Sequence, residues 1–276
     1  MTTGNRPADG GHLIIEAEDY EAFIKKEPEA RKFIRRLVGS AEFINNKKRY
    51  CLWLVGASPA ELRKMPEVMK RIELCRQDRL NAPDPGRRKL ADTPTMFRET
   101  LNPQSFIAVP EVSSERRSYV PMGFMDSNII CTNKIQLMPG ATFYHFGILE
   151  SSVHMSWMRT VCGRLKSDYD YSKNIVYNNF PWPDLTEEQK DQIGLTAQGI
   201  LDARALYPDC SLADLYDEAT MPPELRKAHQ ANDRVVMKAY GFDPSLTEPE
   251  IVAKLMDRYQ KLAEKANTPA AAKKKR

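Results

Sequence analysis

The sequence predicts an α+β protein in which an antiparallel sheet with accompanying helices is followed by an all-α region. Short β-like runs separated by Pro, Gly, Asn and Asp fill residues 105–149. Helical patterns with capping signals fill residues 184–266. Basic residues are in excess over 1–183 and acidic residues over 184–266, so only the first part is expected to face an anionic partner.

Length and composition limit the possible classes of protein. The chain has 276 residues, 42% of them hydrophobic, which is enough for one large or two modest domains. It has no run of about 18 apolar residues, so no membrane span is expected. The first residues, M-T-T-G-N-R-P-A-D-G-G, lack an apolar signal core, which predicts a cytoplasmic protein. Five cysteines without a C-x-x-C pair predict reduced thiols.

The first hundred residues predict turns, helices and one strand. Residues 4–11 (G-N-R-P-A-D-G-G) form turns and match no phosphate-binding loop. Helical periodicity covers residues 17–38, where Pro28 either separates two helices or opens the second one. Residues 50–55 predict a buried strand, and Ser58 with Glu61 predicts a capping box before the next helices. The basic triplet Arg87, Arg88 and Lys89 fits a phosphate contact or a solvated loop equally well.

Five short runs between residues 105 and 149 predict the antiparallel sheet: S-F-I-A-V-P, S-Y-V-P-M-G-F, N-I-I-C-T-N, K-I-Q-L-M-P and A-T-F-Y-H-F-G-I-L. A polar connection, residues 111–117, separates the first two runs. Residues 151–163 then predict a helix with an apolar methionine face. His145 and His154 lack further ligands at metal spacing, so structural roles are expected and no metal site is predicted.

Helices are predicted throughout residues 184–266. Thr186 with Gln189, and Thr247 with Glu250, form capping boxes at the starts of two long helices. Another helix opens at Met221-Pro222-Pro223 and ends at Gly241. Residues 267–276 form a basic, low-complexity tail that is expected to be disordered. The predicted division is therefore 1–183, 184–266 and the tail.

The segment between these regions, residues 159–183, combines basic, acidic and aromatic residues. Lys166, Asp168 and Asp170 stand at alternate positions, so an extended chain would point them the same way. Lys can donate to guanine O6 and N7, and Asp can accept from the cytosine amino group, which makes base reading in DNA one interpretation. The other is a solvated strand whose charges pair with one another.

Three long segments resemble a known family. They are G-R-L-K-S-D-Y-D-Y-S-K-N-I-V-Y-N-N-F-P-W-P, L-D-A-R-A-L-Y-P-D-C-S-L-A-D-L-Y-D and M-P-P-E-L-R-K-A-H-Q-A-N-D-R-V-V-M-K-A-Y-G-F. They resemble the MmeI-like DNA adenine methyltransferases, single chains that are in many cases fused to a nuclease in type II-L restriction–modification systems. In that family a nuclease, a helical spacer and a methyltransferase domain precede a target-recognition domain and a C-terminal helical domain. This chain is similar only to the last two.

The resemblance implies roles for particular residues. Lys166 and Asp168 correspond to a pair that reads one base pair of double-stranded DNA in the major groove. Asp170 with Lys134 resembles a second reading pair, and Glu111 with Asn133 a third. The DNA backbone is expected to be contacted by basic residues around them: Arg116, Arg117, Arg159, Arg164 and Lys173.

The catalytic signature of the family is absent from the sequence. Adenine methylation in this class uses an [N/D]-P-P-[Y/F] segment, which N-P-Q-S, M-P-P-E and F-P-W-P do not match, and no glycine-rich loop for S-adenosylmethionine is found. We therefore assign no catalytic residue and no cofactor to this chain, and expect both in a methyltransferase domain or subunit. Two alternatives stay open: a complete small methyltransferase, and an inactive remnant or scaffold.

Overall fold

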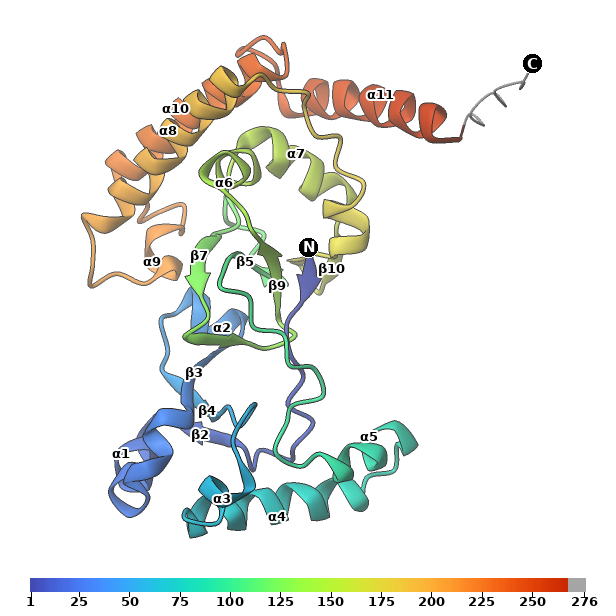
Figure 1. Ribbon diagram of the computed structural model, residues 1–276. Helices are drawn as coiled ribbons and strands as arrows, with labels where there is room; N and C mark the ends of the chain where they lie inside the picture. Colours follow the sequence, from blue (N-terminus) through green and yellow to red (C-terminus); the bar gives the residue numbers. More distant parts are fainter. Residues whose placement is uncertain (268–276) are drawn as a thin grey trace. The chain divides into compact units, whose positions relative to one another are not determined.

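The computed structural model describes residues 1–267, which form two compact units (Figure 1). The first unit comprises Met1–Val112, Pro121–Ala141 and Ser211–Ala213, and the second comprises Ser113–Val120, Thr142–Cys210 and the residues from Asp214 onward. Residues 113–120 and 142–183 thus group with the helical region, and the expected domain boundary at residue 183 stays a prediction. The tail predicted for 267–276 lies outside the described residues except for Asn267. None of the helices among residues 1–267 is both long and apolar enough to span a bilayer.

Two four-stranded sheets form the centre of the first unit. One has the order β1-β9-β5-β7 and is antiparallel throughout; its strands are Thr2–Thr3, Ile135–Pro139, Ser105–Pro110 and Gly123–Asp126. The other has the order β2-β4-β3-β8, with strands Ile14–Glu16, Arg49–Leu52, Ile34–Val38 and Ile129–Cys131. Its β3–β8 pair is parallel, so the antiparallel arrangement that the sequence predicts is not complete.

Helices and 3₁₀ turns join these strands and cover the second sheet. The elements are α1 (Ala17–Lys26), η1 (Pro28–Phe33), α2 (Ser40–Ile44), α3 (Pro59–Leu62), α4 (Pro66–Leu80), α5 (Pro85–Lys89) and η2 (Leu90–Asp92). Residues from β2, β3 and α4 form one buried cluster, including Ile15, Leu37 and Val68. Ser58 and Glu61 form the predicted capping box of α3, because each side chain accepts from the other residue's backbone N–H.

The segment 4–11 is held by a buried arginine. Arg79 of α4 is fully buried and donates to five backbone carbonyls, at distances of 2.6 to 3.2 Å. Two of these carbonyls belong to Pro7 and Ala8, and the others to Leu90, Thr93 and Met96. The guanidinium therefore satisfies groups that loops would otherwise leave unpaired in the interior.

Three local predictions for the first 149 residues are wrong. The second helix expected before Val38 is a 3₁₀ turn followed by strand β3, since Ile34–Val38 pairs with β4 and β8. Residues 141–149, expected as a strand, contain helix α6 (Phe143–Leu149), which starts where His145 Nδ1 accepts the Thr142 N–H at 3.1 Å. The basic triplet lies in helix α5 and not in a loop; there Arg87 pairs with Asp78 and Arg88 donates to two carbonyls. A phosphate contact by the triplet stays a prediction.

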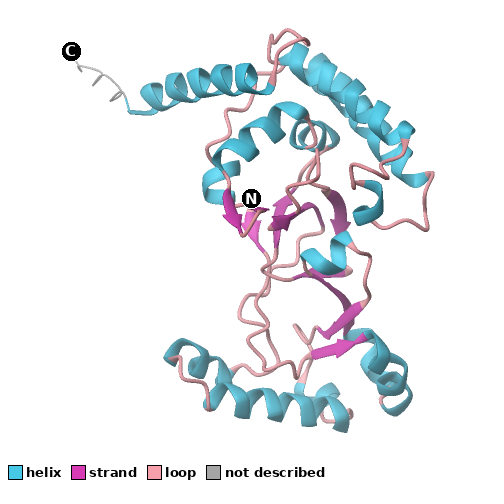
Figure 2. Cartoon of the chain, turned by 180° about the vertical axis from the view of Figure 1, so that it is seen from behind, coloured by secondary structure: helices cyan, strands magenta, loops and turns pink. Residues whose placement is uncertain are grey.

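The second unit is mostly helical (Figure 2). Its helices are α6, α7 (Ser152–Val161), α8 (Glu187–Ala205), α10 (Pro223–Ala239) and α11 (Glu248–Asn267), with the π-helical turn η3 (Lys173–Tyr177). The short helix α9 (Leu212–Leu215) is divided between the units: its first two residues are assigned to the first unit and its last two to the second. Helices α8 and α10 run side by side (Figure 1). The predicted capping box of Thr186 and Gln189 is confirmed at the start of α8.

A small third sheet has the order β10-β11-β6, with β10 at Gly163–Leu165, β11 at Asp168–Asp170 and β6 at Val112–Ser113. Buried aromatic residues join α7 to the segment that follows β11: Trp157 Nε1 donates to the Val176 carbonyl, and Tyr171 OH lies 3.1 Å from His154 Nε2. His154 has the structural role that the sequence predicts, and burial lowers its pKa to about 3.

Candidate nucleic-acid interface

The predicted reading residues Lys166, Asp168 and Asp170 lie on one β-hairpin. Strands β10 and β11 pair antiparallel, with Leu165 opposite Asp168, so Lys166 and Ser167 form a two-residue turn. Asp168 and Asp170 therefore share one face of β11, as expected from their spacing. The expectation that Lys166 extends the same row is wrong, because it occupies the turn with a φ of 57°.

An aromatic anchor fixes the hairpin. Tyr169, between the two aspartates, points to the opposite face and is only 5% exposed. Its ring lies 4.3 Å from the Arg164 guanidinium carbon, and its hydroxyl donates to the Glu115 carbonyl at 3.3 Å. Lys166 is exposed at the tip, whereas both aspartates are half-buried. The hairpin thus presents one exposed donor beside two acceptors on a supported strand.

Segment 113–120 passes beside this hairpin and carries two of the predicted backbone-contact residues. Arg116 is exposed. Arg117 is half-buried, and burial lowers its pKa while the charges of Asp168 and Asp217 act in the opposite direction. Asp168 therefore has a cationic neighbour on its own unit.

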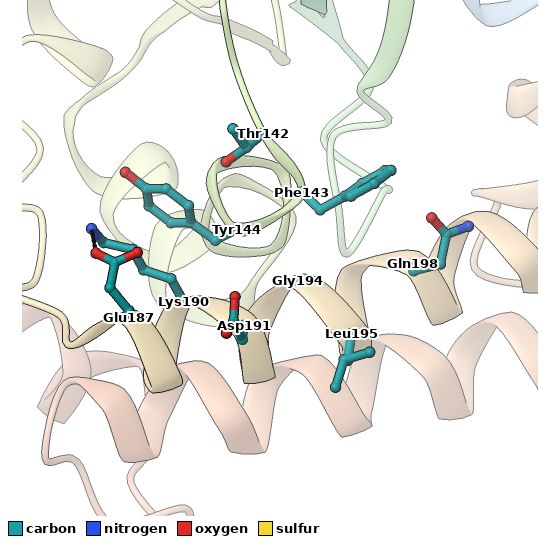
Figure 3. Close-up of a pocket in the computed structure, with 9 residues that line it drawn as sticks. All are labelled: Thr142, Phe143, Tyr144, Glu187, Lys190, Asp191, Gly194, Leu195 and Gln198. Atoms are coloured by element: carbon teal, nitrogen blue, oxygen red, sulfur yellow. Dashed lines mark hydrogen bonds and ion pairs between the residues drawn. The ribbon is translucent and has the colours of Figure 1, made fainter.

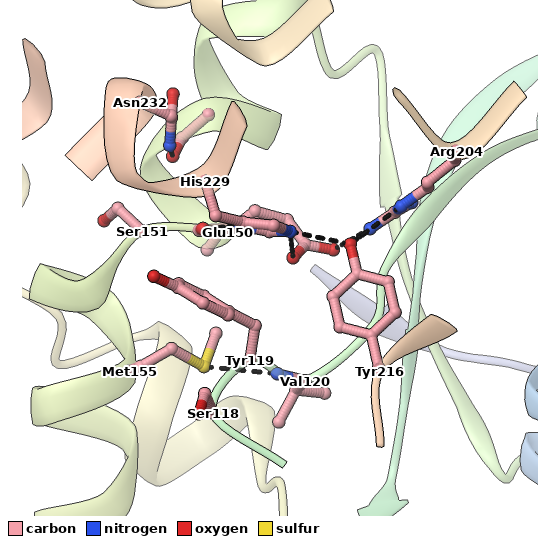
Figure 4. Close-up of polar contacts among 12 residues, drawn as sticks. Ser118, Tyr119, Val120, Glu150, Ser151, Met155, Arg204, Tyr216, His229 and Asn232 are labelled. Carbon is pink, nitrogen blue, oxygen red and sulfur yellow. Dashed lines mark hydrogen bonds and ion pairs between the residues drawn. The ribbon is translucent and has the colours of Figure 1, made fainter. Parts of the chain in front are cut away.

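A buried polar network anchors segment 113–120 to the helices (Figure 4). The Tyr119 hydroxyl donates to Asp233 Oδ2 at 2.6 Å, and its ring stacks on His229 at 4.0 Å between centroids. The Val120 N–H donates to the sulfur of Met155 at 3.3 Å. Tyr119 and Val120 therefore hold the segment to α10 and α7, and they follow closely after Arg117, the neighbour of Asp168.

The network ends in a buried ion pair. Arg204 Nη2 lies 2.7 Å from Glu150 Oε1, and Glu150 is fully buried. Arg204 also donates to the Tyr216 hydroxyl, which lies 2.9 Å from His229 Nε2. With Arg204 as its donor, Tyr216 gives its own proton to His229, and the imidazole Nδ1–H donates to the Glu150 carbonyl. Burial and the Arg204 charge lower the pKa of His229 to about 3, so the ring is neutral.

The other predicted backbone-contact residues differ in how far they are already engaged. Arg159 makes a two-pronged ion pair with Glu248, at 2.8 and 2.9 Å, and donates to the Ser118 carbonyl. Arg164 is exposed, with Glu115 at 4.0 Å. Lys173 is half-buried at the start of η3. The geometry favours a structural role for Arg159 and leaves Arg164 better placed for an external anion.

The remaining predicted reading residues lie in the first unit. Asn133 and Lys134 are on the turn between β8 and β9, and Glu111 lies between β5 and β6. Lys134 Nζ lies 3.2 Å from Glu111 Oε2, with the lysine side chain 59% exposed and the glutamate 26%. The Glu111 N–H also donates to the Lys134 carbonyl at 2.9 Å. Asn133, the preceding residue, is half-buried. The structure thus brings together Lys134 and Glu111, whereas Asp170 belongs to the other unit and its pairing with Lys134 stays a prediction.

A cavity of about 660 Å³ in the second unit lies apart from these residues (Figure 3). It is formed by the start of α6 and one side of α8, with Phe143 and Leu195 among its apolar residues and a Lys190–Glu187 ion pair at its edge. Within residues 1–267 no cluster of His, Cys, Asp and Glu has the form of a metal site.

The sequence did not reveal the residues that support the interface. Tyr119, Glu150, Arg204 and Asp233 come from four separated segments, and no short motif links them. The hairpin turn was also missed, because Lys166-Ser167 is not one of the Asn-Gly or Asp-Gly pairs that signal a two-residue turn. A glycine at residue 166, where φ is positive, would have indicated a turn, but this position holds lysine.

Two known proteins are similar to this chain over nearly its whole length. The chain is 40% identical over 263 residues to DNA methyltransferase A of Bacillus subtilis (strain 168), matching 95% of this chain and 30% of that protein. Its structure matches that of the type IIL restriction–modification enzyme MmeI in complex with DNA, with a TM-score of 0.93 and 44% identity, over 95% of this chain and 35% of the other. The chain thus spans about a third of the length of these relatives.

Family models account for nearly all of the described residues. Residues 1–184 match the target recognition domain of MmeI, and residues 185–266 match the MmeI C-terminal domain. The chain therefore belongs to the MmeI family, of which it contains the target recognition domain and the C-terminal domain.

Proposed function

We propose that this chain is a recognition module that reads base pairs in double-stranded DNA for a site-specific adenine methyltransferase of the type II-L restriction–modification class. Lys166 donates to guanine O6 and N7, and Asp168 accepts from the amino group of the paired cytosine. The observation that carries the proposal is the hairpin that presents these two residues, in a chain 44% identical to a relative whose structure contains DNA. A hairpin of this size fits the major groove, which admits a two-stranded ribbon.

The second reading surface is the turn that carries Asn133 and Lys134. Glu111 and Lys134 form an ion pair, so on binding DNA each must exchange that partner for a base edge, or the pair must contact the base pair as a unit. Asp170 completes the proposed set from the hairpin. Exposed ion pairs contribute at most about 1 kcal/mol, so their exchange is a small cost beside a good base contact.

Phosphate contacts position the DNA in this proposal. Exposure supports Arg116 and Arg164 as phosphate contacts. Half-buried Lys173 is proposed as a further phosphate contact. Arg117 supports Asp168 electrostatically, and Arg159 is engaged by Glu248. The main role of Arg117 and Arg159 in this proposal is therefore to support the reading surface, and phosphate binding is secondary.

Methyl transfer takes place on another part of the enzyme in this proposal. The [N/D]-P-P-[Y/F] segment and the S-adenosylmethionine site belong to a methyltransferase domain or subunit, and this chain alone is not catalytic. The relatives are about three times as long as this chain, which leaves room for such a domain in them. The cytoplasmic location expected from the sequence stays a prediction.

Selection from a library of random duplexes tests the proposal. The purified chain should enrich one sequence and bind it at least about 10³-fold more tightly than unrelated duplexes at physiological salt. Equal binding of all duplexes, or none at low salt, would contradict a reading function and favour a scaffold. Tight S-adenosylmethionine binding by this chain in calorimetry would instead favour a complete small methyltransferase.

A further inference from the structure

The N-terminal residues Gly4 and Asn5 lie against the turn that carries two proposed reading residues. That turn spans 132–134, between β8 and β9. The Asn5 N–H donates to the Cys131 carbonyl at 2.8 Å, and the Asn133 N–H donates to the Asn5 carbonyl at 2.9 Å. Asn5 and Thr132 form a parallel β-bridge. The backbone of Asn133 is thus held by a segment more than a hundred residues away in sequence.

The Asn5 side chain locks this contact in place. It is fully buried, and its Nδ2 donates to the carbonyls of Leu101 and Cys131 at 2.8 and 3.1 Å. Its Oδ1 accepts the Leu101 N–H at 2.7 Å. Only a carboxamide supplies two donors and an acceptor from one short side chain, so aspartate or leucine cannot replace it here. Asn5 therefore joins the chain before β5 to the end of β8.

Gly4 allows the close approach that this contact requires. Its N–H donates to the Ile135 carbonyl at 2.9 Å, at the far end of the turn. A Cβ on Gly4 would lie 2.3 Å from the Thr132 carbonyl oxygen, which is a backbone atom that cannot swing aside. The absence of a side chain at residue 4 is therefore a condition for the observed turn.

Lys134 is held from the other side. Its carbonyl accepts from the Ser40 hydroxyl at 2.6 Å and from the Glu111 N–H at 2.9 Å. Every backbone group just described at Asn133 and Lys134 is thus bonded to a segment outside the turn. Base reading tolerates displacements of only about 0.5 Å, so this bonding bears directly on discrimination.

We infer that Gly4 and Asn5 are positioning residues for base reading by Asn133 and Lys134, with Ser40 supporting the same turn. This inference rests on the proposed function. Gly4 and Asn5 set the position of the turn's backbone, and their loss relaxes discrimination at the base pair read by the turn. The hairpin that carries Lys166 belongs to the other unit, and its discrimination is independent of them.

Binding to duplexes that differ from the selected sequence by one base pair tests this inference. Asn133→Ala first identifies the base pair read by the turn, and Lys166→Ala the one read by the hairpin. Asn5→Ala, and the milder Ser40→Ala, should then reduce discrimination at least about fivefold at the first base pair and leave the second unchanged. Ser58→Ala is the matched control, because it removes a helix cap in the same unit without touching the turn.

Three results would overturn the inference. In the first, Asn5→Ala and Ser40→Ala weaken binding to all duplexes equally. In the second, Ser58→Ala, at a comparable loss of Tm, also reduces discrimination at the base pair read by the turn. In the third, amide hydrogen exchange at Asn133 is as slow in Asn5→Ala as in the unmodified chain. If the unmodified chain discriminates between no duplexes, the proposed function fails with it, whereas normal discrimination with any of these results removes only the positioning role.

Discussion

The two proposed reading surfaces are built in opposite ways. The hairpin of β10 and β11 is a local structure: its strands are adjacent in sequence, and Tyr169 and Arg164 stabilise it from within. The turn that carries Asn133 and Lys134 is held by distant segments, through Asn5, Ser40 and Glu111. A local hairpin can change its tip residues without altering its frame, whereas each change in the turn affects bonds to other segments. We expect new specificities to arise more readily at the hairpin.

The hairpin's neighbouring segment nevertheless depends on the buried network, and breaking that network should have the largest effect. Arg204→Ala leaves the fully buried Glu150 carboxylate without its guanidinium partner. The free energy of unfolding should fall by about 3–5 kcal/mol, as measured by urea denaturation. Arg226→Ala is the control, because its ion pair with Glu218 is exposed and should cost less than about 1 kcal/mol. Equal losses in the two variants would show that the network is not an anchor.

Acid should destabilise the second unit through its two buried histidines. His154 and His229 have pKa values lowered from 6.5 to about 3, so between these values the unfolded state binds more protons. Stability should therefore fall as the pH drops below 6.5, by about 1.4 kcal/mol per pH unit for each ring. Urea denaturation at pH 6 and pH 5 measures this slope, which should be smaller in His154→Gln. An unchanged slope would mean that His154 is protonated in the folded state.

Loss of the Lys166 amine should reduce discrimination at one base pair. Lys166→Ala should reduce discrimination there by about 1–3 kcal/mol, because it removes the donor to guanine without altering the strands. A binding titration with duplexes changed at each base pair measures the effect. Arg116→Ala is the comparison: as a proposed phosphate contact, it should weaken binding to every duplex alike and reduce the salt dependence. The same pattern for both variants would exclude base reading by Lys166.

The smallest expected effect separates stability from function at the hairpin tip. Lys166 has a φ of 57°, in the left-handed region that disfavours a side chain. Lys166→Gly should therefore raise the free energy of unfolding by about 0.5–1 kcal/mol. It should also reduce discrimination at the same base pair as Lys166→Ala. Thermal denaturation of the two variants side by side measures the difference. A glycine variant no more stable than the alanine one would show that the turn is unstrained.

Local signals in the sequence were sufficient where the structure depends on neighbours in the chain. The capping boxes at Ser58 and Thr186 follow from side chains three residues apart, and both are confirmed. The failures lie where distant pairing decides. Ile34–Val38 has a helical pattern, yet it is a strand because β4 and β8 offer their hydrogen-bonding edges on either side. Periodicity alone does not report such partners.

By itself the sequence determined the α+β class, the helical second part with its long helices after residue 184, and the family to which the chain belongs. It also placed Asp168 and Asp170 on one face of a strand, since alternation is a property of any extended chain. The turn at Lys166 is local, but its Lys-Ser pair carries no turn signal, so it appeared only in the structure. Only the tertiary structure paired Lys134 with Glu111 and brought Asn5 against Asn133. The physical reason is that hydrogen bonds and ion pairs between distant segments form only when the whole unit folds, and no short motif encodes them.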